Sequence, residues 1–202
     1  MTQIVDYIFD FGSPNAYFVH KVLPDIADRT GAQFNYIPCL LGGIFKATNN
    51  QAPMMAYGKI KGKMDYERLE IQRFIIKHRL QDFTFNKHFP VNTLIMMRAA
   101  IAAERDGVLA PYIEAGMAAM WENNKDMSDP EVFAATLSEA GLDGPALLAA
   151  TQDPEVKAKL AENTEAAVNR GAFGIPTFFV GDEMFFGKER LGQLEEEIIA
   201  RA

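Results

Sequence analysis

The sequence predicts an α/β fold, because a strand-helix-strand opening and a hairpin ending enclose a long helical block. Residues 4–11 are a β-branched and aromatic run that ends at Gly12, which is typical of a strand followed by a turn. Residues 33–38 alternate in character before the next proline stop, and they predict the second strand. Residues 177–180 and 183–186 flank Gly181-Asp182 and predict a hairpin in which the glycine takes positive φ.

Helix-start signals place the helices between these strands. Ser13-Pro14 combines an N-cap residue with a proline at the first helical position, and it predicts a helix to about Gly31, bent at Pro24. The segment Asp-Pro-Glu-Val opens two further helices, at 129–132 and 153–156, with Asp as the cap. From 42 to 171 no convincing strand is present, so this stretch is predicted to be helical. A last helix is expected from about residue 188 to residue 201. The second Asp-Pro-Glu-Val helix should bury one face, made of Val156, Leu160, Thr164, Ala167 and Val168.

This order of elements is the thioredoxin plan with a large all-helical insertion. The expected domains are a discontinuous thioredoxin-like domain, residues 1–41 and 172–202, and an inserted helical domain, residues 42–171. The insertion should lie over the functional end of the sheet.

Composition excludes several classes of protein. The chain has 202 residues, 49% of them apolar and 23% charged, which is ordinary for a globular protein. A net charge of −7 argues against a nucleic-acid partner, and no apolar run is long enough to cross a membrane. The single cysteine, Cys39, forbids an intrachain disulfide, and we expect it to be a buried small apolar residue. The three scattered histidines lack metal-ligand spacing, so no metal is expected. The N-terminus lacks signal-peptide features, which predicts a cytoplasmic location.

Two positions could carry chemistry. Ser13 follows the first strand, where ligands gather in open α/β sheets, and a hydroxyl at a helix N-terminus can donate to an anion. Thioredoxin-type proteins carry Cys-x-x-Cys in this turn, whereas this chain has Ser13 and Ala16, so disulfide exchange is excluded. Pro176 precedes the late hairpin, and a cis bond there would expose the backbone of Ile175 to an extended peptide. The alternatives are a simple helix cap at Ser13 and an ordinary trans proline before a strand.

Five separated motifs, in order along nearly the whole chain, resemble those of the 2-hydroxychromene-2-carboxylate isomerase and kappa-class glutathione transferase family, within the DsbA-like thioredoxin superfamily. They are residues 9–14 (Phe-Asp-Phe-Gly-Ser-Pro), 41–48 (Leu-Gly-Gly-Ile-Phe-Lys-Ala-Thr), 63–66 (Lys-x-x-Tyr), 89–93 (Phe-Pro-Val-Asn-Thr) and 173–177 (Phe-Gly-Ile-Pro-Thr).

The resemblance implies a glutathione site. Ser13 resembles the serine that hydrogen-bonds the glutathione sulfur and favours its thiolate, and Ile175, before Pro176, resembles the residue whose backbone pairs with the cysteinyl part. Asn50 and Lys63 resemble groups that hold the tripeptide, although either Asn49 or Asn50 can align. The segment Gly187, Lys188, Glu189 and Arg190 resembles a Gly-x-Asp-Arg segment that binds the γ-glutamyl group, with Glu189 in place of the commoner Asp.

Lys46 and Phe89 resemble residues of a second pocket, for a planar aromatic carboxylate. Phe89 could equally be an ordinary core residue, and Lys63 could belong to a solvated lysine-rich face. His88 is interpreted as a lone exposed histidine. Trp121 and the methionines before it are expected in the core of the insertion.

The implied function is a glutathione-dependent isomerase that interconverts 2-hydroxychromene-2-carboxylate and trans-o-hydroxybenzylidenepyruvate in aromatic catabolism, with glutathione as a regenerated cofactor. One alternative is a kappa-type glutathione transferase, and another is a non-catalytic thiol- or peptide-binding module. The resemblance also implies a homodimer.

Overall fold

The computed structural model describes residues 2–201, and its elements follow the predicted order. The strands are β1 (Ile4–Phe9), β2 (Gln33–Pro38), β3 (Thr177–Val180) and β4 (Glu183–Phe186). The helices are α1 (Pro14–Thr30), α2 (Leu41–Thr48), α3 (Pro53–Tyr57), α4 (Lys63–His78), α5 (Leu94–Arg105), α6 (Leu109–Trp121), α7 (Pro130–Glu139), α8 (Gly144–Ala150), α9 (Pro154–Asn169), the 3-10 turn η1 (Lys188–Arg190) and α10 (Leu191–Ala200).

The four strands form one mixed sheet in the order β2-β1-β3-β4. Strands β1 and β2 are parallel, and Ile4 lies opposite Gln33 at the start of their register. Strand β3 runs antiparallel to both β1 and β4, so the C-terminal hairpin adds to the side of β1 that β2 leaves open. The predicted thioredoxin plan, in which a βαβ half and a ββα half meet in one sheet, is confirmed.

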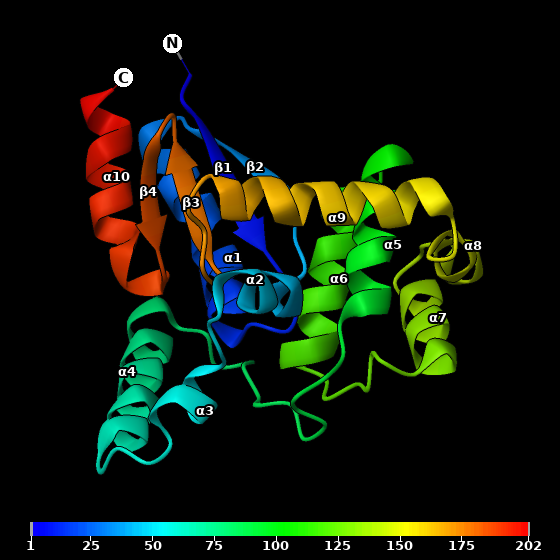
Figure 1. The fold of residues 1–202 in the computed structure, drawn as a ribbon, viewed down its shortest axis with the longest axis horizontal. Coiled ribbons are helices and arrows are strands. Elements are labelled where there is room, and N and C mark those ends of the chain that lie inside the picture. The colour runs from blue at the N-terminus through cyan, green and yellow to red at the C-terminus, as the bar shows by residue number, and fades with distance from the viewer. Residues whose placement is uncertain (1, 202) are drawn as a thin grey trace.

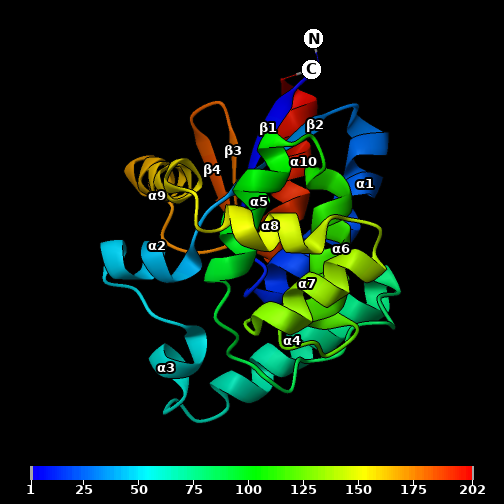
Figure 2. The ribbon, with the colours of Figure 1, turned by 90° about the vertical axis from the view of Figure 1, so that its right-hand side faces the viewer.

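Helices cover both faces of this sheet. Helices α1 and α10 contact each other and lie on one face, whereas α9 runs over the other face and also contacts α2 and α5 (Figures 1 and 2). Helices α5 to α8 form a group to one side of the sheet, and α9 runs from the sheet across this group. Helices α3 and α4 project from the opposite side of the molecule (Figure 1). This arrangement puts the helical part beside the end of the sheet where β1 meets α1.

The core is continuous between the sheet and the helical part. Phe11 and Phe178, near the sheet, and Trp121 and Phe133, in the helical part, are all fully buried in one cluster. Cys39 is also fully buried, and Trp121 and the methionines of α6 lie in the core as expected. The domain boundaries at residues 41 and 172 stay a prediction.

The helix starts follow the predicted capping chemistry. Ser13 caps α1 by accepting a hydrogen bond from the Ala16 amide, and Asp129 and Asp153 cap α7 and α9 through backbone amides of their first turns. Helix α1 continues through Pro24. The predicted face of α9 is buried except at Val168, which is half-buried, and the last helix is preceded by η1. Among residues 2–201, no helix is both long and apolar enough to span a bilayer.

Gly116 of α6 lies against the ring of Phe11, which stands just before the turn that carries Ser13. This close contact predicts that a larger residue at position 116 destabilises the protein. A Cβ atom at Gly116 would lie 2.5 Å from Cε1 of the fully buried Phe11 ring. We expect Gly116→Ala to destabilise the protein by about 1–3 kcal/mol, because overpacking displaces a core side chain. Urea unfolding monitored by circular dichroism measures the change in midpoint.

Gly42→Ala in α2 is the matched control, since a Cβ there meets nothing within 4 Å. Alanine favours a helix over glycine by ~0.5–1 kcal/mol, so this variant should be neutral or slightly stabilised. Equal midpoints for the two variants would contradict the proposed close contact with Phe11.

Candidate active site

The site centres on the contact between Ser13 and Ile175, which are 162 positions apart in the sequence. The Ser13 hydroxyl donates to the Ile175 carbonyl at 3.2 Å, and both residues are buried. The same oxygen accepts from the Ala16 amide at 3.3 Å as the cap of α1. An O–H···O hydrogen bond is normally about 2.7–2.8 Å long, so the hydroxyl proton is held loosely and can be redirected to a nearby anion.

The segment before β3 presents its backbone to Ser13. The Ile175-Pro176 peptide bond is cis, the arrangement that sequence alone left open. Within residues 2–201 the Ile175 amide has no hydrogen-bond partner, whereas the Pro176 carbonyl accepts from the Gly187 amide at 2.9 Å. The Asn50 side chain donates to the Phe173 carbonyl at 2.7 Å. The structure therefore brings together four of the predicted site residues, Ser13, Ile175, Pro176 and Gly187, and ties Asn50 to the same segment.

Asp10 supports the turn that carries Ser13. Its carboxylate is fully buried and accepts from the amides of Gly12 and Leu41, each at 2.8 Å, and from the Thr93 hydroxyl. Burial raises the pKa of the Asp10 carboxyl, and these three hydrogen bonds partly oppose the rise. One side chain thus joins the end of β1, the start of α2 and the residue before α5.

Trp121 holds the same turn from the helical part. Its indole N–H donates to the Phe11 carbonyl at 2.8 Å, and both side chains are fully buried. Phe89 lies against Trp121, with ring centroids 6.1 Å apart, and against the half-exposed Phe85 at 5.0 Å. This places the predicted substrate-pocket residue Phe89 in an aromatic group that contacts the Ser13 turn through Trp121.

The other predicted ligand-holding residues lie farther out on the surface. Lys63 begins α4, pairs with Glu67 and lies 5.5 Å from the Tyr57 ring centroid. The hydrogen bond with Glu67 raises the pKa of Lys63, so the ammonium is charged at neutral pH. Lys46 is exposed on α2 and makes no ion pair with any residue in the described range. Neither lysine has a direct contact with Ser13 among the hydrogen bonds of the structure.

The segment after β4 contains a buried cation. Lys188 is 4% exposed, pairs with Glu189 and lies 5.4 Å from the Phe74 ring centroid of α4. A ligand ammonium would therefore have to share Glu189 with Lys188. Arg190 is exposed, and its amide donates to the Gly187 carbonyl at 3.2 Å.

The chain's own thiol is unsuited to catalysis. Burial raises the pKa of the Cys39 thiol to about 12, and the nearby Asp10 carboxylate acts in the same direction. At neutral pH Cys39 is therefore protonated and shielded from solvent. No group of three or more His, Cys, Asp and Glu side chains in residues 2–201 is arranged to hold a metal ion.

A family model described as a DSBA-like thioredoxin domain matches residues 4–199. The chain belongs to the DsbA-like thioredoxin family. This DsbA-like chain is 30% identical to a 2-hydroxychromene-2-carboxylate isomerase of Pseudomonas putida, over 96% of this chain and 93% of that protein. It is 26% identical to glutathione S-transferase kappa 1 of Rattus norvegicus, over 94% of this chain and 88% of the relative.

A solved structure of a 2-hydroxychromene-2-carboxylate isomerase superposes on this DsbA-like chain with a TM-score of 0.82 at 27% identity. The superposition covers 96% of this chain and 94% of the other. The resemblance stated from the motifs is confirmed: within the DsbA-like family, this protein belongs with the isomerases and kappa-class transferases.

Two residues that support the site were missed by the sequence reasoning. Asp10 was named only as part of the motif at residues 9–14 and was given no role. Its position between two phenylalanines at the end of a predicted strand is nevertheless a signal for a buried carboxylate. Trp121 was predicted as core alone, and its bond to the Phe11 carbonyl carries no local sequence signal. Both act on this DsbA-like site by fixing the turn that presents Ser13.

The raised pKa of Asp10 predicts a pH-dependent effect of Asp10→Asn. The folded pKa lies above that of the unfolded chain, so the carboxyl contributes most to stability below about pH 4, the unfolded value. Its contribution falls as the pH rises through the folded pKa. The difference in free energy of unfolding between wild type and Asp10→Asn should therefore shrink from pH 4 towards neutrality, which urea unfolding at several pH values measures.

Asp28→Asn is the control, because Asp28 is an exposed carboxylate on α1. Where Asp10 is ionised, Asp10→Asn should also lose about 1–3 kcal/mol, since an amide NH2 cannot accept the hydrogen bond that one carboxylate oxygen accepts. A difference from wild type that stays constant across the pH range would contradict the assigned pKa direction.

Proposed function

We propose that this protein is a glutathione-dependent isomerase that interconverts 2-hydroxychromene-2-carboxylate and trans-o-hydroxybenzylidenepyruvate. One observation carries the proposal: the Ser13 hydroxyl donates to the Ile175 carbonyl at the end of β1, and the Ile175 amide has no hydrogen-bond partner within residues 2–201, whereas the one thiol of the chain, on Cys39, is buried. A thioredoxin-type site with this arrangement is suited to a ligand that brings its own thiol.

The residues present fit glutathione. Its cysteinyl backbone can pair with the unpartnered amide of Ile175, as an extended peptide pairs with a strand edge. Lys63 offers a charged ammonium for a carboxylate, and Asn50 is already fixed next to the same segment. Gly187, whose amide binds the Pro176 carbonyl, opens the segment to which Glu189 and Arg190 belong, which would receive the γ-glutamyl end.

Ser13 supplies the charge stabilisation. When bound, glutathione supplies a thiolate that adds reversibly to a carbon-carbon double bond of the keto acid, so the bond can rotate before the thiolate leaves unchanged. The Ser13 hydroxyl can turn from the Ile175 carbonyl to a sulfur anion, because its present hydrogen bond is long. The N-terminus of α1, at which Ser13 is the cap, adds a positive potential that favours the anionic form.

The substrate end is proposed around Phe89 and Lys46. The aromatic group of Phe85, Phe89 and Trp121 offers a surface for a planar ring. Lys46 has no ion pair among residues 2–201 and so offers a cation for the carboxylate. The homodimer and the cytoplasmic location stay predictions.

A kappa-type glutathione transferase is the second candidate, since the rat kappa transferase also matches nearly the full chain. The isomerase is favoured because the Pseudomonas isomerase has the higher identity, 30% against 26%. A module that binds thiols without catalysis is the third.

Calorimetry with glutathione, followed by absorbance of 2-hydroxychromene-2-carboxylate with and without it, separates the three candidates. Ring-opened product that accumulates only with glutathione supports the isomerase. Binding without turnover of the chromene, but with conjugation of a test electrophile such as 1-chloro-2,4-dinitrobenzene, indicates the transferase. Binding with neither reaction indicates the module, and absence of binding contradicts the site itself.

Ser13→Ala should lower kcat/KM of the isomerisation by about 10²-fold, comparable to the loss of one transition-state hydrogen-bond donor. Glutathione affinity should change little, because the peptide contacts remain. Loss of a donor to the thiolate raises the thiol pKa, so the pH-rate profile should shift towards the free-thiol value of about 8.5. Steady-state kinetics from pH 6 to 9 measure both effects.

Ser13→Thr is the matched control, since it keeps a hydroxyl and a capping oxygen. It should retain more activity than Ser13→Ala and should keep the wild-type pH profile. An alanine variant with wild-type kcat/KM and an unshifted profile would show that the hydroxyl is only a helix cap.

Lys63→Met should raise the Kd for glutathione about tenfold, because a carboxylate loses its charged partner while the aliphatic stem is kept. Isothermal titration at low ionic strength measures this change. Lys61→Met is the control, as Lys61 is an exposed neighbour on the same lysine-rich stretch. If both variants weaken binding equally, Lys63 acts only through the general charge of that surface.

A further inference from the structure

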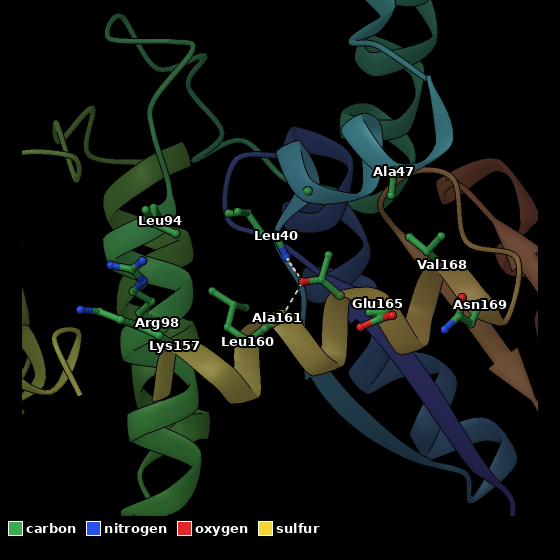
Figure 3. A pocket seen from close by; sticks show the side chains of 12 residues that line it. Leu40, Ala47, Leu94, Arg98, Lys157, Leu160, Ala161, Glu165, Val168 and Asn169 are labelled. Atoms are coloured by element: carbon green, nitrogen blue, oxygen red, sulfur yellow. Dashed lines mark hydrogen bonds between the residues drawn. The ribbon is translucent and has the colours of Figure 1, made fainter. Parts of the chain in front are cut away.

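A pocket of about 590 Å³ lies between α2, α5 and α9 and has no part in the function proposed above. Leu40, Leu94 and Leu160 line it with apolar surface, and Arg98 and Lys157 come together at one end (Figure 3). Glu165 lies farther along α9 towards the other end (Figure 3). The volume is within the range of about 300–1,000 Å³ that is usual for small-molecule sites.

The pocket is separate from the Ser13 site. None of Ser13, Ile175 and Lys63 lines it. Its floor is firmly held: the Leu40 amide donates to the Thr164 hydroxyl at 3.0 Å, and that hydroxyl donates to the Leu160 carbonyl at 2.7 Å. These bonds join the residue before α2 to α9, so this part of the lining is held in place.

Neither cation is paired with an acidic side chain in the part of the chain that the structure describes. Arg98, which is half-buried, makes no ion pair or side-chain hydrogen bond with any residue from 2 to 201. Within the described residues, the Lys157 ammonium donates to a single side chain, the neutral Gln152, at 3.1 Å. By contrast Arg105, two turns farther along α5, is paired with Asp106 and Asp153. Two like charges that converge without a paired anion repel each other, and a bound anion would relieve that repulsion.

We propose that this pocket binds a small apolar monocarboxylate. Arg98 and Lys157 hold its carboxylate, and the leucine surface receives its hydrocarbon part. Lys157 and Glu165 are eight positions apart on α9, or about 12 Å along the helix axis. A ligand that carries a hydroxyl opposite its carboxylate can therefore donate towards Glu165, whereas a second carboxylate at that end would be repelled.

The test uses 6-hydroxy-2-naphthoate as the probe, with saturating glutathione present throughout. Its fluorescence gives the Kd for wild type, Arg98→Gln, Lys157→Gln and Ala161→Phe, the last of which fills the pocket without changing its charge. Lys159→Gln is the matched control, because Lys159 is on α9, pairs with Glu162 and does not line the pocket. The neutral 6-hydroxy-2-naphthamide tests the need for the carboxylate.

We expect a saturable probe site whose affinity falls tenfold or more for the amide and for the Arg98, Lys157 and Ala161 variants, and does not change for Lys159→Gln. The proposal is overturned if the probe does not bind, or if these three variants bind it as wild type does. It is equally overturned if Lys46→Gln weakens binding and Arg98→Gln does not, because the probe then occupies the predicted substrate end. Failure of glutathione to bind, measured separately, would count against the proposed function and leave this pocket untouched.

Discussion

The buried carboxylate of Asp10 is the interaction on which the site depends. It binds the amides of Gly12 and Leu41, and so it fixes the turn before α1 and the start of α2 together. Burying a carboxylate is costly unless its oxygens are satisfied, and here hydrogen bonds from three segments repay part of that cost. The position of α2, which carries Lys46 and leads to Asn50, is thereby coupled to the position of Ser13.

The second constraint comes from the other side of the turn. Trp121 binds the Phe11 carbonyl, and Gly116 leaves just enough room for the Phe11 ring. The helical part therefore contributes to the site, because α6 fixes the position of the turn that carries Ser13. Opposite it, Ile175 completes the site with a carbonyl and a free amide. A site assembled from β1, α6 and the segment before β3 is rigid because each element is fixed by the core that they share.

Local signals in the sequence were sufficient for most of the fold. The caps Ser13, Asp129 and Asp153 act within four residues, so they can be identified without tertiary information. The pairing of Ser13 with Ile175 came from the element order and the family motifs. The partners of Asp10 and the role of Trp121 could not be predicted, because they depend on contacts between segments far apart in the chain. The convergence of Arg98 and Lys157 from two helices is equally invisible in the sequence.

Electrostatics links the two proposed ligand regions. With a net charge of −7, the protein as a whole repels anions such as glutathione and aromatic carboxylates. Binding must then depend on local cations. Lys63, proposed for glutathione, is shared with Glu67, whereas Lys46, proposed for the substrate end, and Arg98, in the pocket beside α9, make no ion pair within residues 2–201. Because screening at physiological ionic strength acts over about 8 Å, each such cation can attract a carboxylate despite the acidic surroundings. Increasing salt should therefore weaken carboxylate binding in both regions only modestly, since the attraction in each region acts over a single contact distance.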